Sequence, residues 1–117
     1  MDKHVVNLEI AKELKEAGWK NPTWFHYDCD IKNALVIKQD KPRYSIDGIN
    51  CPLATEILEE LPVGIKGNAF IQDLTIRKDV EGYYNINYGS KILITEKDLP
   101  NALAKMWLYL KKEKINV

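Results

Sequence analysis

The sequence has no excess of charge of either sign, and this limits the partners it can take. Its 117 residues carry 17 lysines and arginines against 17 aspartates and glutamates, so the formal net charge is zero. A general nucleic-acid-binding protein needs a basic excess to neutralise phosphates. Only Arg43 and Arg77 are arginines, so bidentate recognition of phosphate or guanine has few candidates. The composition therefore argues against nucleic acid as a partner.

Cysteines and long apolar segments are also scarce. Cys29 and Cys51 are too few for a disulfide framework, so we expect free thiols in a reducing compartment, with a single bridge as the alternative. No segment reaches the ~20 apolar residues of a membrane span, and the first residues are not followed by the apolar run of a signal peptide. We therefore expect a soluble protein of the cytoplasm, with no membrane partner.

The motifs of common cofactor and catalytic sites are missing as well. Residues 64–67, Gly-Ile-Lys-Gly, have neither the spacing of a phosphate-binding loop nor a following serine or threonine. Glu56, Glu59 and Glu60 fall on the solvated face of a predicted helix, which does not favour a glycosidase-type carboxylate pair. We therefore expect no cofactor and no catalytic residue.

What the sequence does contain is typical of one globular domain over residues 1–117, since 45% of the residues are hydrophobic and 29% are charged. Two segments predict helices with clear ends. Asn7 is a suitable cap for a helix over residues 7–17, and Gly18 then allows Trp19 to fold back as in a Schellman ending. Pro52 suits the first turn of a helix over residues 52–61, and Pro62 lies just past its end.

A third predicted helix, over residues 99–113, has an unusually wide apolar surface. One stripe at helical spacing consists of Leu99, Leu103, Met106, Trp107 and Leu110. Ala104 and Leu108 form a second apolar patch, and the polar strip is limited to Asn101, Lys105 and Lys112. Such a helix either lies deep in its domain or contacts a second body. In the second case we expect Ala104 and Leu108 to form the interface, with a homodimer as one candidate.

The remaining segments predict strands. Residues 24–27 and 34–39 have the pattern of a hairpin, residues 44–46 that of a brief third strand, and residues 63–68 that of a linker loop. Residues 70–77, 83–88 and 92–95 alternate in polarity and are joined by short turns, which favours an antiparallel meander. The order is helix, two or three strands, helix, three strands, helix. It predicts an α+β fold with three helices and a mainly antiparallel sheet of about five strands.

Two places could carry metal or thiol chemistry. His26, Asp28, Cys29 and Asp30 are the densest set of potential metal ligands, but four ligands at zinc spacings are not present. A hydrated turn with local hydrogen bonds is the favoured interpretation, so we expect no metal. Cys51 precedes Pro52 at the start of a predicted helix, where the helix dipole is expected to lower the pKa of its thiol. A small cytoplasmic enzyme that uses Cys51 or the His26 and Asp28 region is therefore an alternative.

The better binding candidate lies on the late strands. If Tyr84, Ile86 and Tyr88 face the core, then Tyr83, Asn85 and Asn87 project from the opposite face of the sheet. Arg77 and Thr75 on the neighbouring strand add a charge and a hydroxyl to this surface. A plain polar sheet face is the favoured interpretation of this surface, and a site for a base, a nucleotide or a peptide is the alternative.

Three segments carry a resemblance to a known family. They are LEIAKELKEAG at residues 8–18, CPLATEILEELP at residues 51–62 and ALAKMWLYL at residues 102–110. Together they resemble a family of small uncharacterised proteins of tailed phages and prophages of gut Firmicutes and Bacteroidetes. In that family a first helix, a middle helix that opens with proline, and a final Ala-Leu-Ala helix occur in this order. The shared patterns form cores, so they indicate a fold rather than an activity.

The resemblance implies a class of function. A phage origin favours a non-enzymatic accessory protein that acts in the host cytoplasm by binding a host protein or a small nucleotide ligand, in host takeover or counter-defence. A virion or assembly component is a further alternative.

Overall fold

The computed structural model describes residues 5–28, 35–44, 49–66, 71–89 and 92–113. The elements found there are α1 (Leu8–Glu16), β1 (Thr23–Asp28), β2 (Leu35–Arg43), β3 (Ile49–Asn50), α2 (Ala54–Glu60), β4 (Gly64–Lys66), β5 (Ile71–Lys78), β6 (Tyr84–Tyr88), β7 (Ile92–Glu96) and α3 (Leu99–Lys112). The strands form two antiparallel sheets, with the orders β2-β1-β3 and β4-β5-β6-β7. The predicted α+β class and its three helices are confirmed.

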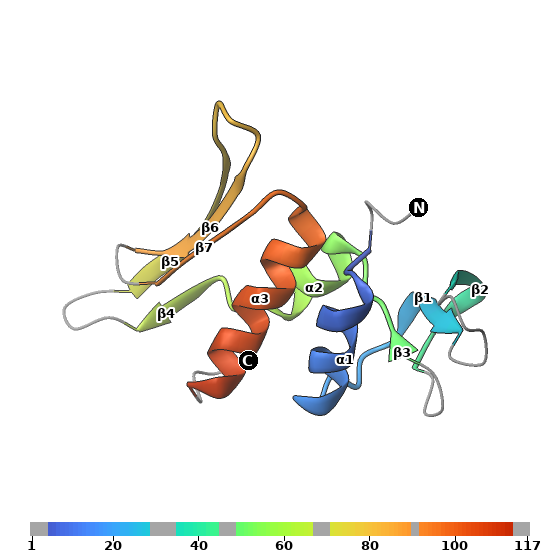
Figure 1. Ribbon diagram of the computed structural model, residues 1–117. Helices are drawn as coiled ribbons and strands as arrows, with labels where there is room; N and C mark the ends of the chain where they lie inside the picture. The colour runs from blue at the N-terminus through green and yellow to red at the C-terminus, as the bar shows by residue number, and fades with distance from the viewer. Residues whose placement is uncertain (1–4, 29–34, 45–48, 67–70, 90–91, 114–117) are drawn as a thin grey trace.

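The helices lie between the two sheets (Figure 1). Helix α3 packs against β6 and β7 on one side and against α1 and α2 on the other, while α1 also contacts β3. One cluster of buried side chains runs through both sheets and all three helices. Within this cluster Trp19 and Trp107 meet edge to face, with ring centroids 5.3 Å apart and planes at 69°.

The strands differ from the prediction in number and grouping. The predicted hairpin is β1 with β2, but it belongs to a separate sheet from the late meander. Residues 64–66, predicted as part of a loop, form β4, in which Gly64 pairs with Asp73. Three residues are too few to show a period-2 pattern, so the pairing with β5 is what defines β4 as a strand. In the predicted strand at residues 44–46, Tyr44 is outside any strand and the other two lie outside the described residues.

Helix α1 has the ends that its sequence predicts. The Asn7 side chain accepts a hydrogen bond of 2.9 Å from the backbone N–H of Ile10, which satisfies a free donor of the first turn. At the other end Gly18 has a φ of 99°, and the backbone N–H of Trp19 donates to the Leu14 carbonyl at 2.9 Å. This is a Schellman ending, and it places Trp19 in the core.

Two side chains of helix α2 lie where their polarity does not predict. Leu58 is apolar, yet it is 39% exposed. Glu56, predicted to face water, is half-buried and accepts hydrogen bonds from the backbone N–H groups of Leu53 at 2.7 Å and Trp24 at 3.1 Å. Burial raises the pKa of this carboxyl group despite these two donors. Glu56 therefore ties strand β1 to the start of α2.

Helix α3 is enclosed by its own chain. Eight of its 14 residues are buried, as expected for a helix with neighbours on both sides. Asn101, predicted to be polar surface, is among them, and its Oδ1 accepts from the backbone N–H of Asn7 at 2.9 Å. Lys105 stays at the surface in an ion pair with Glu96.

The predicted interface on α3 needs a correction. Ala104 is 0% exposed within the single chain. The prediction that Ala104 contacts a second body is therefore wrong, because no part of its side chain reaches the surface. Leu108 is partly buried and packs against the same core. The sequence left two interpretations of this helix open, a helix deep in its domain and a helix that contacts a second body. The structure shows the first.

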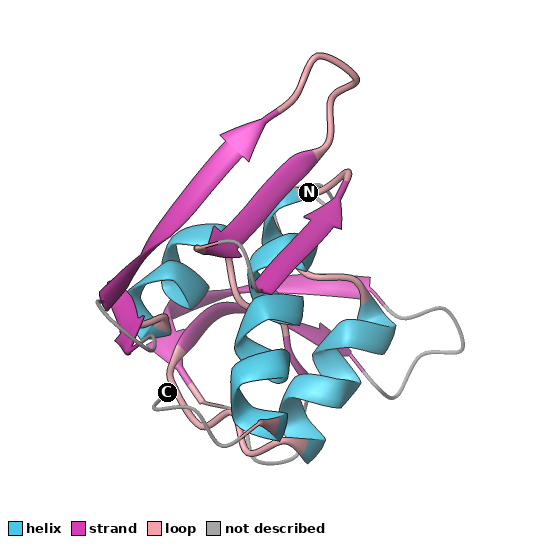
Figure 2. Ribbon diagram, turned by 90° about the vertical axis from the view of Figure 1, so that its left-hand side faces the viewer, coloured by secondary structure: helices cyan, strands magenta, loops and turns pink. Residues whose placement is uncertain are grey.

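The β4–β7 sheet has one covered face and one open face. We call the face under α3 the inner face; it carries Ile86 and Tyr88, which are fully buried. The opposite, outer face carries Asp73, Thr75, Arg77, Asn85, Asn87, Leu93 and Thr95. Figure 2, which turns the left side of Figure 1 towards the viewer, shows the hairpin of β5 and β6 extending past the helices. Ile76 pairs with Ile86 and shares the inner face, but it is 39% exposed.

Candidate functional site: the outer face of the β4–β7 sheet

Antiparallel pairing brings the candidate residues into two rows across the outer face. One row consists of Thr75, Asn87 and Leu93, which are direct partners across β5, β6 and β7. The next row consists of Arg77, Asn85 and Thr95. Directly opposed side chains lie on the same face at close spacing, so the two rows form one continuous surface.

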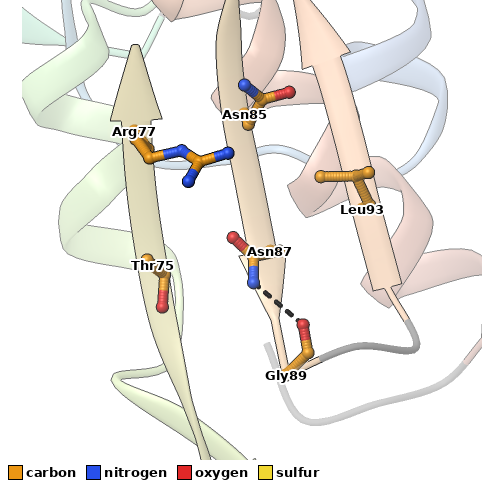
Figure 3. A pocket seen from close by; sticks show the side chains of 6 residues that line it. All are labelled: Thr75, Arg77, Asn85, Asn87, Gly89 and Leu93. Atoms are coloured by element: carbon orange, nitrogen blue, oxygen red, sulfur yellow. Dashed lines mark hydrogen bonds between the residues drawn. The ribbon is translucent and has the colours of Figure 1, made fainter. Parts of the chain in front are cut away.

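A depression of about 320 Å³ lies on this surface and is lined by Thr75, Arg77, Asn85, Asn87, Gly89 and Leu93. Figure 3 shows the Arg77 side chain reaching from β5 towards β6, where Asn85 and Asn87 stand above and below it. Leu93 projects from β7 on the far side of Asn87. The structure therefore brings together three of the four predicted ligand-binding residues, Arg77, Asn85 and Asn87.

The two asparagine amides are held in fixed orientations. Asn85 accepts from the Thr95 hydroxyl at 2.8 Å through its Oδ1, and its Nδ2 donates to Asp79 at 3.3 Å. Asn87 donates through its Nδ2 to the carbonyl of Gly89 at 2.8 Å. Gly89 has a φ of 62°, a left-handed conformation that turns its carbonyl towards this side chain and favours glycine. The amides are preorganised, and each still has hydrogen-bonding capacity for a ligand.

The Asp79 carboxylate that anchors Asn85 also builds the β5–β6 turn. It accepts from the backbone N–H groups of Tyr83 and Glu81, both at 3.0 Å. The Tyr83 bond is the main cause that holds the pKa of Asp79 below its ordinary value, with a further contribution from the Asn85 amide. The negative charge of Asp79 is thus stabilised within the turn.

Arg77 supplies the charge of the depression. Its side chain is exposed, and no ion pair or hydrogen bond of its guanidinium is found within the part of the chain that the structure describes. The described residues that line the depression beside it include no carboxylate. A guanidinium offers five donors in a planar fork, which suits a carboxylate or a phosphate. The depression therefore favours an anionic group.

Tyr83, the fourth predicted residue, does not line the depression. It precedes β6, where its backbone N–H is fixed by Asp79, and the Lys97 ammonium lies 5.6 Å from its ring centroid. Among the described residues that line the depression, none has an aromatic side chain for stacking. Sequence reasoning missed Leu93, although alternation along residues 92–95 gives a signal for it, because Ile92 and Ile94 face inward.

The Cys51 thiol is enclosed in the core. The residue is fully buried, and its backbone N–H donates to the Phe25 carbonyl at 3.1 Å. Burial raises the pKa of its thiol to about 12, with a smaller contribution from the charge of Glu56. The prediction of a lowered pKa is wrong, because burial removes the water that would stabilise a thiolate and α2 begins only at Ala54.

The other candidate cluster is only partly described. Cys29, Asp30 and the side chain of Asp28 lie outside the described residues. His26 is half-buried, and its Nδ1 is a buried atom with no hydrogen-bond partner among the described groups. Over the described ranges, no group of three or more histidine, cysteine, aspartate or glutamate side chains could hold a metal ion.

Comparison with protein-family models, curated proteins and solved structures finds no match to this chain. Among the helices of the described residues, none has both the length and the apolar character needed to cross a membrane.

Proposed function

We propose that this protein is a non-enzymatic binding protein whose ligand, a small anionic molecule of the nucleotide class, occupies the depression on the outer face. The observation that carries the proposal is an exposed Arg77 guanidinium that lies between two fixed amides. Arg77 would pair with a phosphate, and charge-assisted bonds of this kind are stronger than neutral ones. Asn85 and Asn87 would bind the polar edges of a base or sugar, and Leu93 would contact its apolar face.

The size of the depression supports a small ligand. Its volume of about 320 Å³ is near the lower end of the range for ligand sites. Since the described lining residues include no aromatic ring, affinity would depend on Arg77 and the amides rather than on base stacking. The resemblance to small phage and prophage proteins supports the same class of function, because such accessory proteins usually act by binding.

The buried Cys51 gives no support to the enzyme alternative that rests on it, since a thiol with a pKa of about 12 is protonated at neutral pH. A host protein is a second candidate partner for the outer face. It is favoured by Ile71 and Leu93, whose side chains are 68% and 61% exposed there. Exposed aliphatic side chains close to polar groups are common in protein-binding surfaces.

Isothermal titration calorimetry tests the proposal. The probes are a panel of adenine and guanine nucleotides, including cyclic ones, with inorganic phosphate as the minimal anion. We expect at least one nucleotide to bind, and Arg77→Ala to weaken its binding by about 10-fold to 100-fold, as for loss of a charged hydrogen bond.

Lys12→Ala is the matched control, because it removes the same charge from the exposed face of α1. Its affinity for the nucleotide should equal that of the wild type. If no nucleotide in the panel binds, or if both variants weaken binding equally, the proposal is wrong.

A further inference from the structure

The outer face has a charge pattern that is complementary to itself. Strand β5 places Asp73 and Arg77 on this face, with Thr75 midway between them, and all three side chains are exposed. Four residues of a strand separate the two opposite charges by about 13 Å. A two-fold axis that crosses the strands at Thr75 would place each Arg77 over Asp73 of a second copy.

The same axis would pass along the row of Thr75, Asn87 and Leu93, which are direct partners across three strands. Each of these side chains would then meet its own counterpart. Leu93, which is 61% exposed, would contact Leu93 of the second copy, and the two Asn87 amides would be close enough to bond. An isologous interface requires this kind of match, in which one patch is complementary to itself.

The open face is also accessible to a flat partner. The described helices lie on the other side of the β4–β7 sheet, as Figure 1 shows. Two sheets pack face to face with their strands nearly aligned, so a second β4–β7 sheet fits this surface. The apolar contacts of such a pair would come from Leu93 near the axis, and from Ile71, which is 68% exposed at the Asp73 end of β5.

We propose that the outer face binds a second copy of this chain, through two Arg77–Asp73 ion pairs around a Leu93 contact. Because Arg77 would serve both partners, the second copy and the anionic ligand compete for it. The competition rests on the proposed function, whereas the self-association does not. Ligand binding would then release the monomer, so the ligand would regulate exposure of the whole outer face.

The first experiment measures self-association by sedimentation velocity over a range of concentrations, without any ligand. We expect a monomer–dimer equilibrium that weakens as salt is added, because exposed ion pairs are screened. Arg77→Asp and Asp73→Arg should each weaken the dimer by at least about 10-fold, because each places like charges together. The double variant, with both changes, should restore it.

The matched control is Lys78→Asp, which makes the same change of charge one residue further along β5, outside the two rows of the outer face. It should leave the dimer unchanged. Circular dichroism establishes that each variant is folded. A wild-type chain that stays monomeric at about 1 mM, a weak affinity for any specific complex, would overturn the proposal. So would a double variant that fails to restore the dimer, or a Lys78→Asp chain that loses it.

The second experiment adds a nucleotide that binds in calorimetry to the preformed dimer. Competition predicts that the dimer fraction falls as the ligand saturates the chain. A dimer that binds nucleotide and stays intact would overturn the competition. If the dimer forms and no nucleotide binds, the self-association is supported and the proposed function fails. If nucleotide binds and no dimer forms, the proposed function is supported and this inference fails.

Discussion

The two faces of the β4–β7 sheet come from the same strands and have opposite roles. The inner face presents Ile86 and Tyr88, which are fully buried beneath α3. The outer face presents Arg77, Asn87 and Leu93 around a depression. Because side chains alternate along a strand, each short stretch of sequence supplies both surfaces. Substitutions one residue apart should therefore have very different consequences.

The faces also differ in how their polar groups are satisfied. On the inner face, the Tyr88 hydroxyl donates a hydrogen bond of 2.6 Å to the Pro62 carbonyl. On the outer face, the described residues leave the Arg77 guanidinium without an ion pair. A buried polar group must find its partner within the fold, whereas an exposed one can take a partner from outside. This contrast is the physical reason to place binding on the outer face.

The largest effect is expected on the inner face, from Ile86→Ala. Ile86 is 0% exposed, so the substitution leaves a cavity under α3. The free energy of unfolding should fall by about 2–5 kcal/mol, the usual range for this truncation in a core. Urea denaturation followed by circular dichroism measures it. A loss below about 1 kcal/mol would show that the inner face is loosely packed, because most core truncations cost more.

A smaller effect is expected from Tyr88→Phe, which keeps the ring and removes the bond to Pro62. The free energy of unfolding should fall by about 0.5–1.5 kcal/mol, the net contribution of one such hydrogen bond. The same denaturation experiment measures it at neutral pH. A value equal to that of Ile86→Ala would show that the hydroxyl, rather than the ring, dominates the packing of this strand.

The same tyrosine predicts a dependence on pH. Burial raises the pKa of Tyr88 from 10.0 to about 12, so the folded chain holds this proton more tightly than the unfolded chain. The stability from this group is therefore fully present below pH 10 and is lost as the pH rises towards 12. Tyr88→Phe should make the free energy of unfolding fall less steeply over this interval. The comparison belongs in a Cys51→Ala background, because Cys51 also has a pKa of about 12.

Local sequence patterns predicted much of this fold. The cap at Asn7 and the ending at Gly18 and Trp19 depend on residues within a few positions of one another. The position of Arg77, Asn85 and Asn87 on one face of the sheet likewise follows from alternation along two strands that are joined by a short turn. Where the interacting groups are close in sequence, residue type and spacing were sufficient.

The errors have tertiary causes. Asn101 and Ala104 are buried because α3 has a sheet on one side and two helices on the other, an arrangement that no helical wheel contains. Glu56 is half-buried rather than solvated because the backbone N–H of Trp24, 32 positions earlier, donates a hydrogen bond to its carboxylate. Tyr83 does not line the depression, because a hydrogen bond to Asp79 fixes its backbone in the turn just before β6 begins. In each case a partner distant in sequence or a turn decided the position.

The smallest effect on stability is expected on the outer face, from Leu93→Ala. Leu93 is 61% exposed, so its truncation removes little buried surface and leaves no cavity. The free energy of unfolding should change by no more than about 0.5 kcal/mol, as for most surface substitutions. The measurement is made at low protein concentration, where a dimer would be dissociated, with Ile86→Ala as the matched inner-face variant. A cost above about 1 kcal/mol would show that Leu93 is part of the core. It would then remove the distinction between a face that holds the fold and a face that is free to bind.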